Sequence, residues 1–253
     1  ALAAGLPESV GCTTVNKVCG SGMKAVMLAH DLLLAGSGDI LVAGGMESMS
    51  NAPYLLAEAR DGYRLGHGRV VDHMFLDGLE DAYTEANRGR LMGSFADDCA
   101  RRYGFSRADQ DGFAATSAAR ARQAVEGGRF TWEIVPVRVP GKAGELFVDR
   151  DEQPGKPHHE SLAALKPAFR PDGSVTAGNA STIADGAAAL VLTRRSVAER
   201  LKLTPLATVA GHATHVQDPA WFATAPAGAM TQLLAAVGWN AGDVDLWEIN
   251  EAF

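Results

Sequence analysis

The residue with the most distinctive chemical surroundings is Cys19, which lies between a strand-like segment, Thr13–Val18, and a helix-like segment, Met23–Ala35. A thiolate is the reactive form of cysteine, and the positive end of a helix dipole stabilises it. Gly20 and Gly22 let a substrate approach the backbone closely. Such a thiol could attack a thioester carbonyl while its own backbone N–H holds the oxyanion. The same pattern also fits a small buried cysteine at a tight turn, or a turn that binds phosphate.

The segments around Cys19 predict a parallel sheet. After the helix-like segment, a turn at Gly36 leads into the apolar run Asp39–Ala43, which closes at Gly44. A strand, a helix and a second strand joined by short turns make a βαβ unit, whose strands run parallel and are buried on both faces. We therefore expect the α/β fold class.

Caps and periodicity predict further elements. Ser106, with Asp109 three residues later, forms a capping-box pattern that opens a helix ending at Gly127. The other predicted elements are a strand over Gly186–Thr193, a helix from Pro226 to Val237 and a strand over Leu246–Ile249. Residues 50–97 and 139–172 have no sustained periodicity, so we expect irregular surface segments there.

Composition narrows the function classes. The 253 residues carry a net charge of −7 without a Lys/Arg run, so we expect no nucleic-acid partner. No apolar run reaches the roughly 18–20 residues that span a bilayer, so we expect no membrane segment.

Cysteine and histidine usage narrows them further. The three cysteines are sparse and odd in number, which predicts a reducing, cytoplasmic compartment. Cys12 and Cys99 have no motif around them and are predicted to be structural. Neither CxxC nor HExxH spacing occurs, so we expect no metal site. His158 and His159 could favour phosphate, but a solvated loop is the simpler interpretation.

Four segments together resemble the thiolase family. They are residues 16–25 (NKVCGSGMKA), residues 43–50 (AGGMESMS), residues 176–181 with 185–188 (TAGNAS and DGAA), and residues 250–253 (NEAF). Residues 77–83 (DGLEDAY) make the resemblance strongest to the acetyl-CoA acetyltransferase branch of the family. Four motifs in the family's order, spread over most of the chain, make a specific match.

The resemblance implies a role for each matching residue. Cys19 would take the acyl group, with its backbone N–H in one oxyanion hole. Asn250 would position a water in a second oxyanion hole, which stabilises the enolate of acetyl-CoA. The residues implied to bind coenzyme A are Ser181, Ala177 and Gly178 along the pantetheine tunnel, Met92 and Phe222 near the acyl end, and Lys166 near the nucleotide.

Most of these residues also have a plain structural interpretation. Ser181 could cap a turn, and Asn250 could be a strand-end amide. Phe222 and Met92 are of types that occur more often in cores than against ligands. Lys166 could be a solvated surface charge.

The resemblance implies an α/β, thiolase-like layered αβαβα fold, incomplete and with an inserted loop domain. Residues 1–48 would be part of the N-terminal thiolase domain, and residues 49–183 a loop domain covering the CoA site. Residues 184–202 would be the last strand region of the N-terminal domain, and residues 203–253 the start of the C-terminal domain. The implied partners are acetyl-CoA and acyl-CoA thioesters, with coenzyme A as part of the substrate, no separate cofactor, and a homodimer or homotetramer as the assembly.

Two features depart from the family pattern. Short-chain members often carry a histidine just before Met92, where this chain has Leu91, so broader acyl acceptance is expected. The family also has a Gly-His-Pro segment and a second reactive cysteine after its NEAF motif, and neither occurs in this sequence. We therefore expect the sequence to be part of a longer enzyme, incomplete at both ends and without the bases that serve Cys19 and acetyl-CoA.

The predicted function is acyl transfer that forms or cleaves a 3-ketoacyl-CoA, such as acetoacetyl-CoA, through an acyl-cysteine. Three alternatives remain open: a broader-chain 3-ketoacyl-CoA thiolase of fatty-acid β-oxidation, a decarboxylating ketoacyl synthase, and a non-catalytic acyl-CoA or lipid-binding homologue. Residues 43–50 argue against the synthase. The intact residues 19–22 argue against a non-catalytic homologue. The missing bases argue for one.

Overall fold

The computed structural model describes residues 1–81, 84–141, 144–156 and 161–253. The helices are α1 (Ser21–Leu34), α2 (Met92–Tyr103), α3 (Arg107–Glu126), α4 (Arg195–Arg200) and α5 (Ala225–Val237). The strands are β1 (Ile40–Ser48), β2 (Tyr54–Leu55), β3 (Val71–Asp72), β4 (Val137–Gly141), β5 (Gly144–Val148) and β6 (Asp185–Thr193). His158 and His159, interpreted above as part of a solvated loop, and the end of the 77–83 segment lie outside the described residues.

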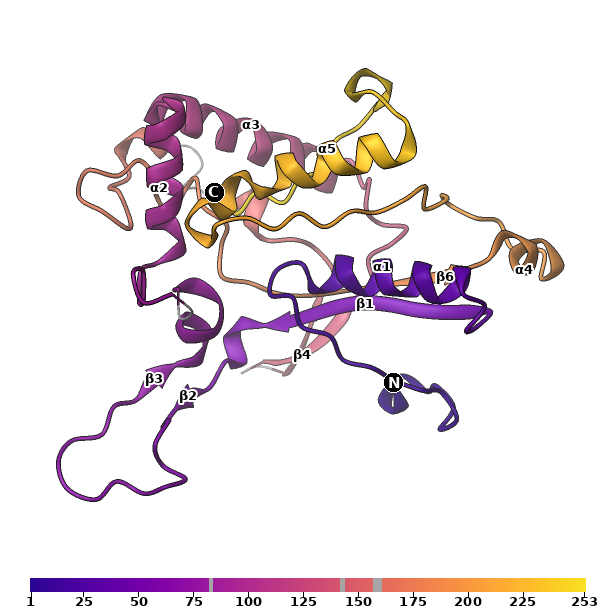
Figure 1. Ribbon diagram of the computed structural model, residues 1–253, viewed down its shortest axis with the longest axis horizontal. Coiled ribbons are helices and arrows are strands. Elements are labelled where there is room, and N and C mark those ends of the chain that lie inside the picture. Colours follow the sequence, from indigo (N-terminus) through magenta and orange to yellow (C-terminus); the bar gives the residue numbers. More distant parts are fainter. Residues whose placement is uncertain (82–83, 142–143, 157–160) are drawn as a thin grey trace. The chain divides into compact units, whose positions relative to one another are not determined.

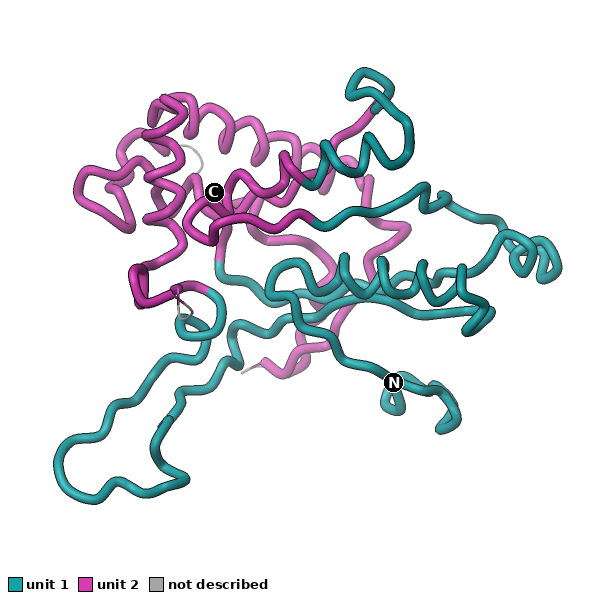
Figure 2. Tube along the Cα trace, viewed as in Figure 1, with its two compact units in different colours: residues 1–78, 183–214, 229–244 teal, residues 79–182, 215–228, 245–253 magenta. Residues whose placement is uncertain are grey.

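The chain divides into two compact units (Figure 2). Unit 1 holds Ala1–Gly78, Ile183–Thr214 and Ala229–Val244. Unit 2 holds Leu79–Thr182, His215–Gly228 and Asp245–Phe253. Among the described segments, none of the helices combines the length and the apolar composition that a bilayer crossing needs.

Unit 1 is built on a two-stranded antiparallel ribbon with a helix against it. β1 pairs with β6 along its whole length, from Ile40 opposite Thr193 to the far end of both strands. α1 lies along this ribbon (Figure 1). Met27 and Leu33 of α1 and Ala43 of β1 are buried, so their apolar side chains form the core that fixes the helix on the ribbon.

The predicted parallel βαβ unit is wrong. Among the described residues, Thr13–Val18 forms no strand, and the only pairing there is an isolated bridge between Lys17 and Cys19. β1 instead pairs antiparallel with β6, which arrives from far along the chain. The prediction assumed that segments joined by short turns pair with each other, so it could not detect a partner strand that is distant in the sequence. The strand predicted over Leu246–Ile249 is also absent, and these residues are irregular. An apolar run of this length is too short to identify the type of element from the sequence.

The helix and strand predictions that rested on caps and longer patterns are confirmed. Ser106 Oγ accepts a hydrogen bond from the Asp109 N–H at 3.1 Å, and the Ser106 N–H donates to Asp109 Oδ2 at 3.0 Å. This capping box opens α3, which ends before Gly127. The predicted strand over Gly186–Thr193 and the helix from Pro226 are present as β6 and α5.

Unit 2 contains a helix that the sequence analysis missed. α2 begins at Met92, inside a segment expected to be irregular. Phe95, Asp97 and Ala100 are all buried, and every residue from Gly93 to Asp97 is buried as well, so the first turns of the helix are enclosed on more than one side. The buried positions therefore do not follow the spacing of a single apolar face, and they include the charged Asp97, which is why periodicity did not reveal α2.

Gly44 is required by the pairing of β1 with β6. A Cβ at this position would lie 2.1 Å from the carbonyl oxygen of Ala188 and 3.0 Å from the Cα of Ala189. These are backbone atoms of the partner strand, which cannot move away without disturbing the ribbon. We expect Gly44→Ala to lower the free energy of unfolding by about 1–3 kcal/mol or more, measured by urea denaturation.

Gly186, on β6 of the same ribbon, is the matched control for Gly44. Apart from Gly186 itself and its two chain neighbours, no heavy atom of the described residues lies within 4 Å of a Cβ built at Gly186. Gly186→Ala should therefore leave the free energy of unfolding unchanged or raise it by up to about 1 kcal/mol. Equal losses in the two variants would contradict the steric explanation.

Candidate active site

Cys19 lies in a sharp turn directly before α1. Its side chain is exposed, and Gly20 is the N-cap of the helix. Val18, just before it, has a φ of 47°. A β-branched residue rarely adopts a positive φ, and such strain costs on the order of 1–3 kcal/mol. The turn places Cys19 directly before the N-cap of α1.

A set of short hydrogen bonds holds this turn. Ser21 Oγ accepts from the Lys17 N–H at 2.7 Å and donates to the Val18 carbonyl at 2.7 Å. Asn16 Oδ1 accepts from the Val18 N–H at 2.9 Å, and the Gly20 N–H donates to the Lys17 carbonyl at 3.0 Å. The neighbouring side chains therefore stabilise the strained backbone that presents Cys19.

The 43–50 motif supports the cysteine turn through β1. A Cβ on Gly45 would lie 3.2 Å from the Cα of Gly22, so these two glycines let the first turn of α1 approach the strand closely. At the other end of the motif, the Ser50 N–H donates to Asp185 Oδ1 at 2.9 Å, and the Ser50 hydroxyl also donates to Asp185. The hydrogen bonds from Ser50 lower the pKa of Asp185. Unit 1 thus brings together the 16–25 and 43–50 motifs and the 185–188 segment.

Unit 2 contains the 176–181 loop, which is held by buried polar groups. Thr176 is 0% exposed, and its N–H donates to Asn179 Oδ1 at 2.7 Å. Asn179 Nδ2 donates to Asp111 Oδ1 at 2.9 Å and to the Ser174 carbonyl at 3.1 Å. Thr176 Oγ1 accepts from the Gly178 N–H at 3.2 Å. These bonds fix the backbone of the loop, which leaves its Ala177 exposed.

The 176–181 loop is joined to the NEAF motif in unit 2. The Ser181 N–H donates to the Ala252 carbonyl at 3.0 Å, and the Ser181 hydroxyl donates to the Glu251 carbonyl at 2.6 Å. Ser117 Oγ of α3 donates to the Glu251 carboxylate at 2.8 Å. Asn250, the preceding residue, is exposed. The structure therefore places Ser181 beside the motif that carries Asn250, with its hydroxyl engaged in a backbone contact.

The other residues predicted to bind coenzyme A lie in different settings. Phe222 is half-buried and packs at 6.5 Å from Phe95 and 6.4 Å from Phe253, measured between ring centroids. Met92 is half-buried at the start of α2, whereas Lys166 is exposed. The contacts of these side chains with a substrate stay predictions.

The predicted site residues fall into two groups, one in each unit (Figure 2). Cys19 belongs to unit 1. The group in unit 2 consists of Met92, Lys166, Ala177, Gly178, Ser181, Phe222 and Asn250.

The sequence analysis missed the residues that anchor the 176–181 loop. Asp97 of α2 accepts hydrogen bonds through Oδ1 from the N–H groups of Ser174 and Val175, at 2.7 and 3.0 Å. Arg107 Nε donates to Asp111 Oδ2 at 2.7 Å, which orients the carboxylate that holds the loop. The four-residue spacing of Arg107 and Asp111 on α3 is a signal that could have revealed this pair. Asp97 carries no such signal, because its partners are distant in sequence.

The two other cysteines differ from Cys19 in their surroundings. Cys99 lies within α2 and is half-buried, and this burial raises the pKa of its thiol, which keeps the thiol protonated and unreactive at neutral pH. Cys12 is exposed in an irregular segment that precedes the strained turn. Of the three, only Cys19 is placed at the start of a helix.

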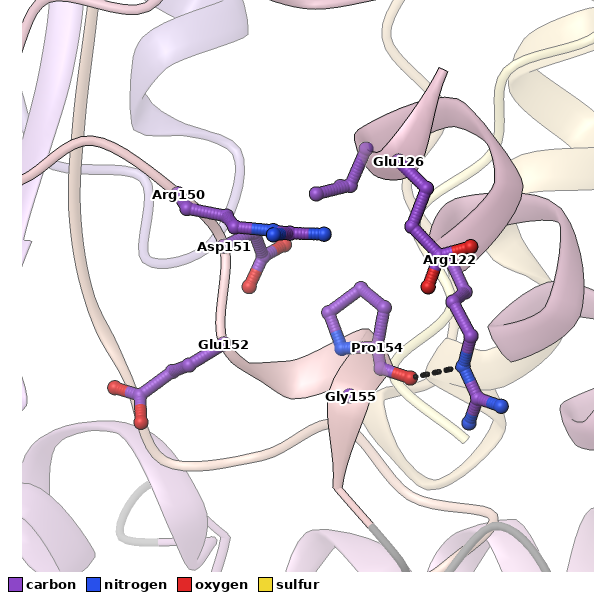
Figure 3. Close-up of a pocket in the computed structure, with 8 residues that line it drawn as sticks. Arg122, Glu126, Arg150, Asp151, Glu152, Pro154 and Gly155 are labelled. Atoms are coloured by element: carbon purple, nitrogen blue, oxygen red, sulfur yellow. Dashed lines mark hydrogen bonds between the residues drawn. The ribbon is translucent and has the colours of Figure 1, made fainter. Parts of the chain in front are cut away.

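A pocket of about 230 Å³ lies in unit 2, between α3 and the segment that follows β5 (Figure 3). It is lined by Arg122, Val125, Glu126, Arg150, Asp151, Glu152, Pro154 and Gly155. The Arg122 guanidinium donates to the Pro154 carbonyl at 3.0 Å. The lining residues include three with carboxylates and two with guanidinium groups, so the lining does not select for an anion such as a nucleotide phosphate. The predicted site residues take no part in this pocket.

Comparisons with known proteins extend these observations to the whole chain. Residues 1–196 match the family model described as thiolase, N-terminal domain, and residues 203–253 match the model described as thiolase, C-terminal domain. Acetyl-CoA acetyltransferase 2 of Arabidopsis thaliana is 51% identical, over 100% of this chain and 62% of its own length. An acetyl-CoA acetyltransferase of Pseudomonas aeruginosa is 48% identical, over 100% of this chain and 64% of its own length.

A solved structure shows the same similarity in three dimensions. The acetyl-CoA acetyltransferase from Syntrophomonas wolfei matches with a TM-score of 0.92 at 41% identity. The match covers 100% of this chain and 62% of that one. The chain therefore spans less than two thirds of the length of the relatives that it matches.

Proposed function

The chain belongs to the thiolase family, and we propose that the protein transfers acyl groups between coenzyme A thioesters through an acyl intermediate on Cys19. Membership rests on the two family models, which match residues 1–196 and 203–253. The agreement with a solved thiolase-family structure confirms the thiolase-like α/β fold predicted from the sequence. The observation that supports the proposed reaction best is the exposed Cys19 in a strained turn at the N-terminus of α1.

In the first proposed step, the Cys19 thiolate attacks the carbonyl carbon of an acyl-CoA. The backbone N–H of Cys19 contributes to holding the oxyanion that forms. Collapse of the tetrahedral intermediate breaks the bond between the acyl carbon and the sulfur of coenzyme A. Coenzyme A leaves as a thiolate and takes up a proton, and the acyl group stays on Cys19 as a thioester.

In the second proposed step, a general base takes a proton from the methyl group of acetyl-CoA, which becomes an enolate; the resemblance to the family implies that this base follows the NEAF motif. Asn250 positions a water that stabilises the negative charge on the enolate oxygen. The enolate carbon attacks the acyl carbon on Cys19, a carbon–carbon bond forms, and the Cys19 thiolate is released. The product is a 3-ketoacyl-CoA such as acetoacetyl-CoA, and the reverse sequence of steps cleaves it.

The 176–181 loop supports the proposed binding of coenzyme A. Buried Thr176 and Asn179 fix the loop without a ligand, so little ordering entropy is lost when a substrate binds to its exposed Ala177. We propose that Ala177, Gly178 and Ser181 line the pantetheine tunnel. By the same family pattern, residues 49–183 would cover the substrate and the protein would assemble as a homodimer or homotetramer.

The proposal is tested by incubating the full-length chain with acetyl-CoA and mapping the modified peptides by mass spectrometry. An acetyl group is expected on the peptide that carries Cys19. The peptides with Cys12 and Cys99 serve as internal controls in the same digest and should stay unmodified. A folded sample that binds acetyl-CoA without acquiring an adduct on Cys19 would contradict the proposed reaction. It would support the alternative that the protein is a non-catalytic homologue.

Leu91 favours a second candidate, a thiolase that accepts longer 3-ketoacyl-CoA chains. The residue is half-buried directly before α2, where short-chain relatives often carry a histidine. An apolar side chain can bury additional methylene groups of a substrate, each worth about 0.8 kcal/mol.

The two candidates are separated by comparing kcat/KM for acetoacetyl-CoA with kcat/KM for longer 3-ketoacyl-CoA substrates. If Leu91 sets the preference, the longer substrates should be cleaved at least as efficiently. Leu91→His should then shift the ratio toward acetoacetyl-CoA by roughly tenfold, the effect of one to two methylene groups. A wild-type protein that cleaves acetoacetyl-CoA alone would exclude the broader enzyme.

A further inference from the structure

Three side chains of unit 1 bring metal-binding atoms together outside the residues assigned to acyl transfer. His30 and Asp31 lie near the C-terminal end of α1, and His212 lies in the irregular segment after α4. One donor atom from each residue lies within 4.8 Å of the other two. His212 Nε2 is 2.8 Å from Asp31 Oδ1, and His30 Nδ1 is 3.6 Å from the same oxygen.

The cluster contains a buried nitrogen whose bonding capacity is unused. Among the described residues, His30 Nδ1 has no hydrogen-bond partner of normal length, although it is shielded from solvent. An unsatisfied buried polar atom costs about 1–3 kcal/mol, so a ligand for this nitrogen would stabilise the folded state. The rings of His30 and His212 meet edge to face with their centroids 5.3 Å apart, which holds both imidazoles near Asp31.

The local electrostatics favour a cation at this position. Asp31 lies in the last turn of α1, where the negative end of the helix dipole also favours positive charge, and that turn has no basic residue. The side chain of Asp31 is 53% exposed, which leaves a path from solvent to the three donor atoms.

We propose that His30, Asp31 and His212 form a binding site for a divalent transition-metal ion, with Zn²⁺ as the expected occupant. Tetrahedral zinc has bonds of about 2.0–2.1 Å to nitrogen and oxygen, which places its ligand atoms about 3.4 Å apart. The two separations that involve Asp31, 2.8 and 3.6 Å, lie on either side of this value, and all three donor atoms lie within 4.8 Å of one another, so binding the ion requires the two imidazoles to adjust their positions. Two imidazoles with one carboxylate suit Zn²⁺ better than Mg²⁺ or Ca²⁺, which prefer oxygen ligands.

A metal ion at this site would tie two distant segments of the chain together. Asp31 and His212 are 181 positions apart in the sequence. α1 begins directly after the turn that carries Cys19, so the ion would also fix the helix that follows this turn. The inference does not depend on the proposed acyl transfer, because the metal site and the nucleophile use different residues.

The site is tested by titrating Zn²⁺ into the metal-free, full-length chain by isothermal calorimetry, after its cysteines have been alkylated so that thiolates do not compete. His30→Gln and His212→Gln should each weaken Zn²⁺ binding at least 10- to 100-fold, the range already typical when only an outer partner of a metal ligand is lost. His67→Gln is the matched control, because His67 is an exposed histidine in an irregular segment. Equal Zn²⁺ affinity in the wild type and in both ligand variants overturns the proposal.

A second measurement uses no variant and therefore does not depend on how well a variant folds. The X-ray absorption spectrum of Zn²⁺ bound to the alkylated wild-type chain should show two imidazole ligands and no sulfur. A shell of oxygen atoms alone, or one with a single imidazole, overturns the assignment. Zn²⁺ should also raise the Tm of the wild type, since it binds the folded state.

Discussion

Replacing Cys19 by alanine is expected to lower the kcat of acyl transfer by the full-length chain roughly 10⁴- to 10⁶-fold, as removal of a nucleophile does in other covalent enzymes. The variant keeps the glycines and the hydrogen-bonded turn, so the loss of activity is due to the missing thiol of Cys19. Serine is not expected to rescue the reaction, because a hydroxyl is much less ionised and less nucleophilic than a thiol at neutral pH. Release of free coenzyme A from acetyl-CoA measures the effect.

Two controls separate a chemical from a structural effect of the Cys19 variant. Cys12→Ala changes another exposed cysteine and should leave the rate within about threefold of the wild type, as a surface substitution away from the site normally does. Cys19→Ala should still bind acetyl-CoA in a calorimetric titration, because the binding residues proposed here lie in unit 2. Full activity in Cys19→Ala, or its loss in Cys12→Ala, would assign the nucleophile to another residue.

Local sequence signals predicted the elements that depend on neighbouring residues. The capping box of Ser106 and Asp109 predicted the start of α3, because both partners lie within one turn of the helix. The Gly20 and Gly22 pattern likewise predicted that Cys19 stands at the start of a helix, although it did not reveal the positive φ of Val18. Both signals act over fewer than five residues, which is why the sequence alone contains them.

Features that depend on distant partners could not be predicted in this way. The parallel sheet was expected because β1 follows a helix closely, yet its partner β6 begins at Asp185. Asp97 had no visible purpose until Ser174 and Val175 were placed against it. His212 was one of several isolated histidines until the fold brought it to Asp31. In each case tertiary packing, rather than local propensity, decides the role of the residue.

The motifs that revealed the family serve the fold as well as the proposed chemistry. Gly44 has no room for a side chain beside the carbonyl oxygen of Ala188, and Ser21 bridges the turn that carries Cys19. Ser181 uses its hydroxyl to hold the backbone of Glu251. A motif match therefore identifies the positions that shape the site, but it does not separate the residues that contact substrate from those that support them.

Asp97 shows how large such a supporting effect can be. The residue is 3% exposed, and its Oδ1 accepts two backbone hydrogen bonds from the segment leading into the 176–181 loop. Each hydrogen bond to a charged group contributes about 1.5–3 kcal/mol, and removing the carboxylate leaves two N–H donors without their acceptor. The buried Oδ2 lacks a partner among the described residues, which offsets part of the loss. We expect Asp97→Ala to lower the free energy of unfolding by about 2–4 kcal/mol in urea denaturation.

Asp98 provides the matched control, because it is the next residue on α2 and makes its contacts through partly exposed ion pairs. Its carboxylate lies 2.7 Å from Arg90 and 2.5 Å from Arg170, and its side chain is 32% exposed. Asp98→Ala should cost about 1 kcal/mol or less, since solvent screens such pairs. Amide hydrogen exchange should speed up at Ser174 and Val175 in Asp97→Ala only. The KM for acetyl-CoA should rise in the same variant, because the loop that we propose to bind coenzyme A is then held less firmly. Unchanged protection of the two amides, together with a wild-type KM, would show that the loop is held without Asp97.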